Sequence, residues 1–458
     1  MTLSAIIAAN RFGLGARPGE LTDIGDDARV WLTRQVAGTR PVPQEVAALP
    51  SSAVAFQTFA KALRERRQDK DAAKSAENGR RQIGAMYRDQ VAARYRLAIA
   101  TEEPFRERLV HFWTNHFAVS ADKAQVVGLA ATLENEAIRP NVGGRFVDLL
   151  LAVEMHPAMI LYLDNQASIG PNSPLAQKAA RRASGDRKLD INENLAREIL
   201  ELHTLGVNGG YTQTDVTTFA RALTGWSVAA ARGKDSAQAG QFQFRPMAHE
   251  PGAKALLGKR YSEDGLAQPR AVLKDLAAHP ATARHVATKL ARHFIADDPP
   301  ERAVSRLTKV FLDTDGGLPS LHRALVESSE AWERTTAKFK TPHDFVVSAF
   351  RMLDFVPQLP EQILAPFQLL GQRPYTPGSP AGWPDTASQW DGPDALLKRI
   401  EWASAVGKRM GSKVQPLEAG AGSLGDALAE RTRVAISRAE SGAQGMALLL
   451  ASPEFQRR

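Results

Sequence analysis

Apolar side chains recur at helical spacing along most of the chain, and few segments show the alternation of a half-buried strand. The clearest helix lies in Leu189–Val216, LDINENLAREILELHTLGVNGGYTQTDV. Asn192 is a suitable N-cap, and glycine residues follow the last apolar position, where a left-handed backbone can end a helix. The core-facing stripe of this helix consists of Leu195, Ile199, Leu202 and Gly206.

One short segment departs from the helical pattern. In GQFQFRPMAHE, Phe242 and Phe244 alternate with polar residues, as in a short strand before a turn. We therefore predict a mainly α protein with a large multi-helix core and at most one small β hairpin.

Composition along the chain suggests three regions. Residues 1–63 read as an N-terminal helical lobe packed on the core, and 64–82 as a charged linker or an exposed helix, because they contain almost no apolar side chains. Residues 83–458 form the main helical domain and carry the candidate site.

The chain of 458 residues contains no cysteine and no apolar run of about 18 residues. We therefore expect no disulfide, no cysteine-ligated zinc and no membrane span. The first residues, MTLSAIIAANRFGLGARPG, lack the features of a signal peptide. As written, the sequence predicts a cytoplasmic protein, with a periplasmic or envelope location if the start has been trimmed.

The predicted central helix carries candidate chemistry beside its apolar stripe. Asn194, Glu198 and Glu201 share a neighbouring stripe, which leaves Glu198 at the apolar boundary where desolvation can raise a carboxyl pKa. The alternative is a solvated face, because Glu193, Arg197 and Glu201 have the spacing of ordinary ion pairs.

A second polar group lies in FWTNHFAVS, where Asn115 and His116 stand among aromatic residues. A buried amide or imidazole needs hydrogen-bond partners, so both are candidates to orient a ligand. A satisfied core histidine is the competing explanation. We expect His116 to approach Glu198, since pairing would satisfy both groups.

Asp164 and Asn165 end a predicted helix and open a loop of about 25 residues before the central helix. The basic part of that loop, Arg181 to Lys188, is a candidate cover for an anionic ligand beside Glu198. Arg221, on the next predicted helix, is a candidate partner for one of the acids.

Near the end of the chain, LGQRPYTPGSPAGWPDTASQWDG breaks every helical period. Aromatic faces on such a loop suit stacking against sugars or other flat ligands, or filling a core. The residues of interest in this loop are Gln372, Tyr375, Trp383, Asp385 and Trp390.

The histidine pattern argues against a metal site. No HExxH motif occurs, and His279, His285 and His293 are spaced too widely to chelate one ion, so we interpret them as packing or capping residues. We predict no bound metal and no cofactor. One alternative stays open, a metal-dependent hydrolase using His116, His156, Asp164 and Glu198.

The net charge of +8 indicates an anionic partner. Nucleic acid is an unlikely one, because the basic stretches Arg64–Arg81 and Lys178–Lys188 do not interleave aromatic residues. A polysaccharide or another anionic or polar ligand fits better.

Several motifs together closely resemble one bacterial family, DUF1800, a domain of unknown function. The motifs are RFGLGA, FWTNHFAVS, HPAMILYLDN, ENLAREILELHTLGVNGGYTQTDV, ARALTGW, KFKTPHDFVVSAFR, LGQRPYTPGSPAGWPD and SPEFQRR. The resemblance covers nearly the whole chain. It implies an uncharacterised, often exported protein and brings no residue roles.

The leading functional hypothesis is a hydrolase that uses paired carboxylates on a glycan or other polar polymer. Its catalytic candidates are Glu198, Glu201, Asp164 and His116. Its binding candidates are Asn115, Asn165, Asn194, Arg221, Tyr375, Trp383 and Trp390. The main alternative is a non-catalytic binding or assembly protein whose polar cluster is structural.

Overall fold

The computed structural model describes residues 2–68, 72–181, 190–231, 236–262, 265–333 and 338–458. Within these ranges the predicted mainly α fold is confirmed, and strands form two small antiparallel pairs. Strand β1 (Trp226–Val228) pairs with β2 (Phe242–Phe244), and β3 (Lys254–Leu256) pairs with β4 (Lys259–Tyr261). The alternating phenylalanines of the sequence therefore lie in β2.

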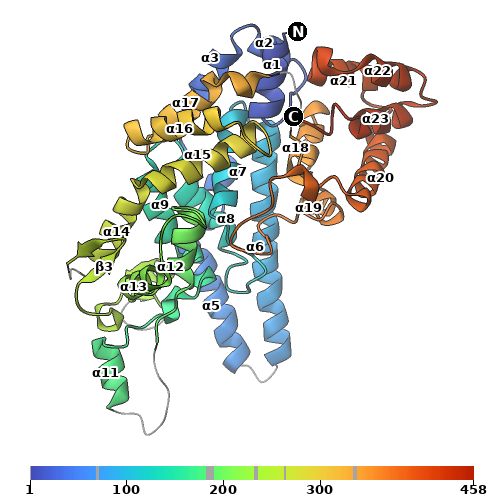
Figure 1. Ribbon diagram of the computed structural model, residues 1–458. Coiled ribbons are helices and arrows are strands. Elements are labelled where there is room, and N and C mark those ends of the chain that lie inside the picture. Colours follow the sequence, from blue (N-terminus) through green and yellow to red (C-terminus); the bar gives the residue numbers. More distant parts are fainter. Residues whose placement is uncertain (1, 69–71, 182–189, 232–235, 263–264, 334–337) are drawn as a thin grey trace.

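The first part of the chain ends in two long helices that pack side by side (Figure 1). The short elements before them are α1 (Leu3–Ile7), the π-helical η1 (Ala8–Phe12), α2 (Glu20–Ile24), α3 (Ala28–Val36) and α4 (Gln44–Ala47). The long pair is α5 (Ser52–Gln68) and α6 (Ala72–Ala100). Residues 64–68 thus complete α5 and 72–82 begin α6; the division into three regions stays a prediction.

The middle of the chain surrounds α7 (Pro104–His116), a helix with buried residues on every side because it crosses the centre of the core. Pro104 occupies its first turn, where a missing N–H has no cost. The following elements are α8 (Ala130–Thr132), η2 (Leu133–Ile138), α9 (Phe146–Glu154), α10 (Pro157–Tyr162), η3 (Asn165–Ala167), α11 (Pro174–Ala180), α12 (Asn194–Glu198), η4 (Ile199–His203) and α13 (Gln213–Leu223).

The predicted central helix is α12 continued by the π-helical η4. It begins at Asn194, and the Asn192 side chain still accepts a hydrogen bond from Asn194 N (2.9 Å). Leu195 and Ile199 are fully buried, as the stripe requires. Because a π turn holds more residues than an α turn, the regular-helix geometry does not apply beyond Glu198.

The last part of the chain adds two helical groups (Figure 1). The first consists of α14 (Ala267–Ala277), α15 (Pro280–Phe294), α16 (Glu301–Asp313) and α17 (Leu318–Glu327). The second consists of α18 (Pro342–Met352), α19 (Pro360–Leu369), α20 (Pro393–Met410), α21 (Pro416–Leu424), α22 (Glu430–Ser437) and α23 (Gly442–Ala451). Short 3-10 turns are η5 (Ser236–Gln238), η6 (Pro246–Ala248), η7 (Ser329–Trp332), η8 (Ala387–Gln389) and η9 (Gly425–Ala427).

One contiguous apolar core runs through these groups, from Ala5 to Phe455. In the part of the chain that is described, no helix has the length and apolar character needed to cross a bilayer. The core fixes α7, α15 and α18 relative to one another, and these helices carry the side chains described next.

Candidate functional site

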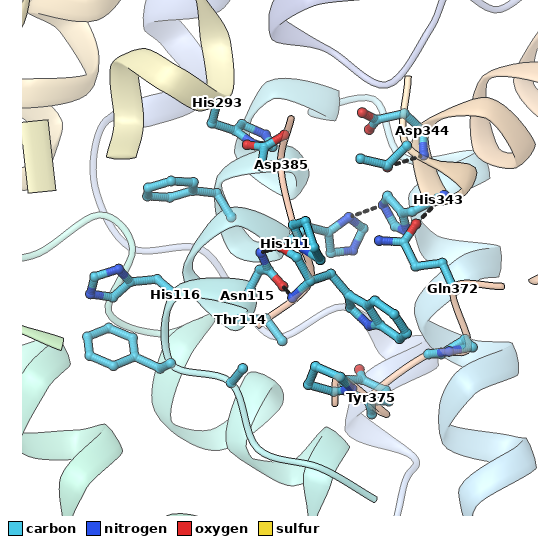
Figure 2. Close-up of a pocket in the computed structure, with 18 of the residues that line it drawn as sticks. His111, Thr114, Asn115, His116, His293, His343, Asp344, Gln372, Tyr375 and Asp385 are labelled. Atoms are coloured by element: carbon cyan, nitrogen blue, oxygen red, sulfur yellow. Dashed lines mark hydrogen bonds and ion pairs between the residues drawn. The ribbon is translucent and has the colours of Figure 1, made fainter. Parts of the chain in front are cut away.

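A cavity of about 320 Å³ is lined by residues of α6, α7, α15 and α18 and by the loop that follows α19 (Figure 2). This volume lies at the lower end of the range for small-ligand sites. Four histidines line it: His111, His116, His293 and His343. We call this cavity the histidine pocket.

Helix α7 contributes one wall through Phe112, Asn115 and His116, which helical spacing places on one side. His116 is 1% exposed, and its Nε2 lies 3.1 Å from the carbonyl oxygen of His203. Since a carbonyl only accepts, Nε2 carries the proton, and the buried Nδ1 has no hydrogen-bond partner among the described residues. Burial, with nearby Lys289, lowers the pKa of His116 well below its usual value.

Helix α15 faces this wall with a stripe of side chains at intervals of four residues: His285, Lys289 and His293. The His285 ring lies 6.0 Å from the His116 ring, and the His293 ring 5.4 Å from the Phe112 ring. Lys289 and His293 line the pocket. The cavity therefore lies where these two helix faces meet.

His293 forms a dyad with Asp385, which lies on the loop after α19. The His293 Nδ1 is 2.6 Å from Asp385 Oδ2, and Figure 2 shows the two side chains together. The buried His293 Nε2 has no hydrogen-bond partner among the described residues. Burial lowers the pKa of His293 to about 4, although Asp385 acts to raise it, so the ring is neutral at pH 7.

Both acids that line the pocket are ionised. Burial alone would raise the pKa of Asp385, but His293 and Lys338 lower it below its usual value. Asp344 lies 3.0 Å from Arg108 and 2.9 Å from Arg458, and these cations hold its pKa well below the usual range despite burial. An ionised Asp385 fixes the His293 proton on Nδ1, which leaves Nε2 free to accept one.

A chain of hydrogen bonds runs from the pocket into the core. The His343 Nε2 lies 3.0 Å from His111 Nδ1 (Figure 2). The His343 Nδ1 lies 3.0 Å from the Tyr95 hydroxyl. The His111 Nε2 is 3.2 Å from Glu107, whose pKa is lowered below its usual value by Arg139 despite burial. Hydrogen bonds therefore join the tyrosine and the two histidines, and the His111 ring lies beside the ionised Glu107.

The described residues contain one group with metal-ligand geometry, Glu107, His111 and Glu134. Its carboxylates are already compensated: Arg139 lies 2.5 Å from Glu107 and 3.3 Å from Glu134, and Arg94 lies 3.0 Å from Glu134. Two guanidinium groups therefore supply the positive charge that a cation would bring.

The loop after α19 is held over the pocket by Asn115. The Asn115 Oδ1 accepts a hydrogen bond from Trp383 N (2.7 Å), and the Asn115 Nδ2 donates one to Trp383 O (2.9 Å). Gly382 has φ +83, and a Cβ there would lie 2.3 Å from the Asn115 carbonyl oxygen, so only glycine fits. Asn115 thus positions Trp383 and Asp385.

The aromatic residues of this loop have different positions. Trp383 is half-buried and lines the pocket, whereas Trp390 is 7% exposed and donates from Nε1 to Pro384 O (2.9 Å). Tyr375 also lines the pocket, and the Arg94 guanidinium carbon lies over it, 4.7 Å from the centre of the tyrosine ring. The buried Tyr375 hydroxyl has no hydrogen-bond partner among the described residues.

The family model described as "Protein of unknown function (DUF1800)" matches residues 7–457 of the chain. The chain belongs to the DUF1800 family. No curated protein and no solved structure matches it. The resemblance of the sequence motifs is therefore confirmed, and the function has to be argued from the site.

Four predicted site residues of this DUF1800 protein line the histidine pocket: Asn115, His116, Tyr375 and Trp383. Glu198 does not line it. Glu198 is half-buried, and within the described chain it has no hydrogen bond or ion pair, so the expected pairing with His116 is not formed. Burial raises the pKa of Glu198, helped by the nearby Glu201.

The other predicted site residues also lie outside the pocket lining. Glu201 accepts from the Tyr211 hydroxyl at 3.4 Å, and Asp164 pairs with Lys123 at 2.7 Å. The buried Asn165 donates to Trp226 O (3.0 Å). Asn194 and Arg221 are exposed, and Trp390 packs behind Trp383. Of the predicted basic cover, residues 182–188 lie outside the described ranges.

Three of the four residues in the metal hypothesis have partners of their own, and Glu198 has no hydrogen bond or ion pair within the described ranges. His156 caps α10 by accepting from Ala158 N (3.2 Å) and lies 3.3 Å from Glu136. His116 and Asp164 have the partners given above. These residues do not form a group with metal-ligand geometry among those described.

His293, which we interpreted as a packing or capping residue of this DUF1800 chain, packs against Phe112 and Phe294 and also lines the pocket. By contrast, His279 does cap α15, accepting from Ala281 N (3.1 Å). The pairing of His293 with Asp385 joins positions 92 residues apart, which spacing along one helix cannot show. The repeat of polar residues at 285, 289 and 293 was the available signal.

Proposed function

We propose that the protein is a hydrolase whose general base is His293 in the histidine pocket. The observation that supports this most is the His293–Asp385 dyad: a neutral imidazole is oriented at Nδ1 by a carboxylate 2.6 Å away, and its Nε2 has no partner among the described residues. Such a dyad is the recurring arrangement for proton abstraction by histidine.

In the proposed step, Nε2 of His293 takes a proton from water while the water oxygen bonds to the electrophilic centre of the substrate. The Asp385 carboxylate stabilises the imidazolium that forms. The proton then passes to the leaving group, which returns His293 to its neutral state. Each turnover thus consumes one water and cleaves one bond.

This proposal places the catalytic residue in the histidine pocket, whereas the sequence pattern placed the catalytic carboxylates mainly on the central helix. A paired-carboxylate mechanism needs one protonated acid near the scissile bond. The pKa values of Asp344 and Asp385 are lowered, so both are ionised, and Glu198, whose pKa is raised, lies outside the pocket lining. In the pocket, His293 offers an imidazole nitrogen, Nε2, that has no partner among the described residues and can accept a proton.

The lining favours a polar ligand of modest size. Trp383 offers an aromatic face for stacking, and the volume of about 320 Å³ suits one sugar-sized group, such as a unit or an end of a glycan. A glycan or another polar polymer therefore remains the proposed substrate class.

The test compares the parent protein with His293→Gln on panels of carboxylic esters, amides, glycosides and phosphoesters. We expect at least one class to be hydrolysed by the parent and the rate to fall by about 10²–10⁴ in His293→Gln, the usual contribution of a general base. Because the neutral ring is required and the pKa of His293 is lowered to about 4, kcat/KM should fall only as the pH drops through about 4.

The matched control is His279→Asn, on the same helix. Asparagine also caps helices well, so this variant should keep both its fold and the parent's rate. Equal rates for the parent and His293→Gln would contradict the proposal, as would an absence of turnover in all four classes.

A non-catalytic binding protein is the second candidate. Lys289 and Arg292 line the pocket without a carboxylate partner among the described residues, which would suffice to hold an anion without any reaction. In that case His293→Gln would bind ligand as the parent does.

A further inference from the structure

We propose that the histidine pocket binds an oxyanion, a carboxylate, phosphate or sulfate group, between Lys289 and Arg292 of α15. The role of this oxyanion as part of a substrate rests on the hydrolase proposed above. The binding of the oxyanion does not rest on that hydrolase activity, because we infer it from the charges of the pocket alone.

The acids of the pocket are already compensated. Asp385 contacts His293 and lies 3.5 Å from Lys338 and 3.8 Å from Arg458. Asp344 is held between two arginines, as described above. Neither acid is therefore left to neutralise a further cation on the pocket wall.

Lys289 and Arg292 are the further cations. Lys289 lines the cavity, is half-buried, and has no hydrogen bond or ion pair among the described residues. Arg292 also lines the cavity; its Nε donates to the carbonyl oxygen of Asp297 (3.0 Å), and it has no carboxylate partner in the described ranges. Half-buried cations without a counter-charge are costly unless a ligand supplies one.

Their spacing suits a shared ligand. Residues three apart on a helix lie on the same side, so both side chains reach one region of the cavity. His293 follows Arg292 directly and is one turn from Lys289. An oxyanion held there lies close to the proposed base and orients the rest of the substrate toward it.

The protonation of Lys289 provides a readout. Burial lowers the pKa of Lys289 to about 8, with Arg292 acting in the same direction and Asp385 opposing it. A bound anion favours the charged amine and raises this pKa, so binding at pH 8 should take up part of a proton. The charged or titratable groups near Lys289 are His116 on α7, His285, Arg292 and His293 on α15, and Asp385 on the loop.

The test is isothermal titration of the full chain with inorganic phosphate, sulfate and acetate at pH 8, in buffers that differ in ionisation enthalpy. We expect saturable binding of at least one anion, with net proton uptake. In Lys289→Met the affinity should fall about tenfold or more and the proton uptake should disappear. Comparing the affinity for acetate with the affinities for phosphate and sulfate shows whether the pocket prefers a carboxylate or a tetrahedral anion.

The control is Lys309→Met on α16, which removes an exposed lysine and the same overall charge from a neighbouring helix. Three results would overturn the proposal: no saturable binding of any of the three anions, unchanged affinity in Lys289→Met, or an equal loss in Lys309→Met. Binding needs no turnover, so failure here leaves the role of His293 intact. Normal anion binding by His293→Gln, with activity lost, would separate the two proposals.

Discussion

Asp344 and Glu198 are acids in opposite environments. Asp344 is 3% exposed and contacts two arginines, so its charge is part of a buried ion-pair group. Glu198 is half-buried, and no hydrogen bond or ion pair reaches it from the described chain. Residue patterns indicated the desolvation of Glu198, and burial does raise its pKa. These patterns did not indicate that Arg221, a candidate partner for one of the acids, is exposed.

The two isosteric amide substitutions should therefore differ in stability. Asp344→Asn leaves Arg108 and Arg458 without their counter-charge, which costs about 3–5 kcal/mol for a buried pair. Glu198→Gln removes a desolvated charge without breaking a contact, so the free energy of unfolding should change by less than about 1 kcal/mol or rise.

Thermal unfolding of both variants beside the parent checks this. At about 2–4 °C per kcal/mol, Asp344→Asn should lower the Tm by roughly 6 °C or more. A comparable fall in Glu198→Gln would mean that Glu198 has an ion-pair partner after all.

Local signals predicted the elements well. Proline at first-turn positions marks α7, α10 and α15, and the histidine before Pro157 and the one before Pro280 each cap their helix. The π-helical turn of η4 had no such local signal, and its last residue, His203, contacts the buried Glu154 of α9 at 2.8 Å. Tertiary contacts of this kind override the regular spacing that sequence analysis assumes.

The loop after α19 depends on one side chain of α7. Asn115→Ala removes both hydrogen bonds to the Trp383 backbone, so the segment around residues 379–391 should open more often. Losing two such bonds costs about 1–3 kcal/mol, and amide exchange at Trp383 should accelerate roughly 10- to 100-fold.

Hydrogen exchange followed by mass spectrometry measures this effect. Asn141→Ala is the control, because within the described ranges the Asn141 side chain donates to the nearby Ala137 O and to no atom of the loop, so this variant should leave the loop protected. Unchanged exchange in Asn115→Ala would show that packing of the tryptophans, and not Asn115, holds the loop.

At the scale of the whole molecule, the mainly α class, the family and part of the pocket could be predicted from sequence. Asn115, His116, Tyr375 and Trp383 stood out because each is polar or aromatic in an unusual local context. The other parts of the pocket could not be predicted, because they depend on side-chain pairs that are far apart in the sequence. His343 and His111 are 232 residues apart, and His293 and Asp385 are 92 residues apart. Such contacts exist only after the core has brought α7, α15 and α18 together.

The proposed function requires His293 to be a neutral base whose Nε2 carries no proton at neutral pH. Nuclear magnetic resonance of protein labelled with nitrogen-15 at histidine tests it directly, with His293→Gln identifying the signal. We predict the Nδ1–H form of His293 from pH 8 to about 5, with protonation of Nε2 only near pH 4. A His293 signal that titrates near the ordinary pKa of about 6.5, or that shows the proton on Nε2 at neutral pH, would contradict the account.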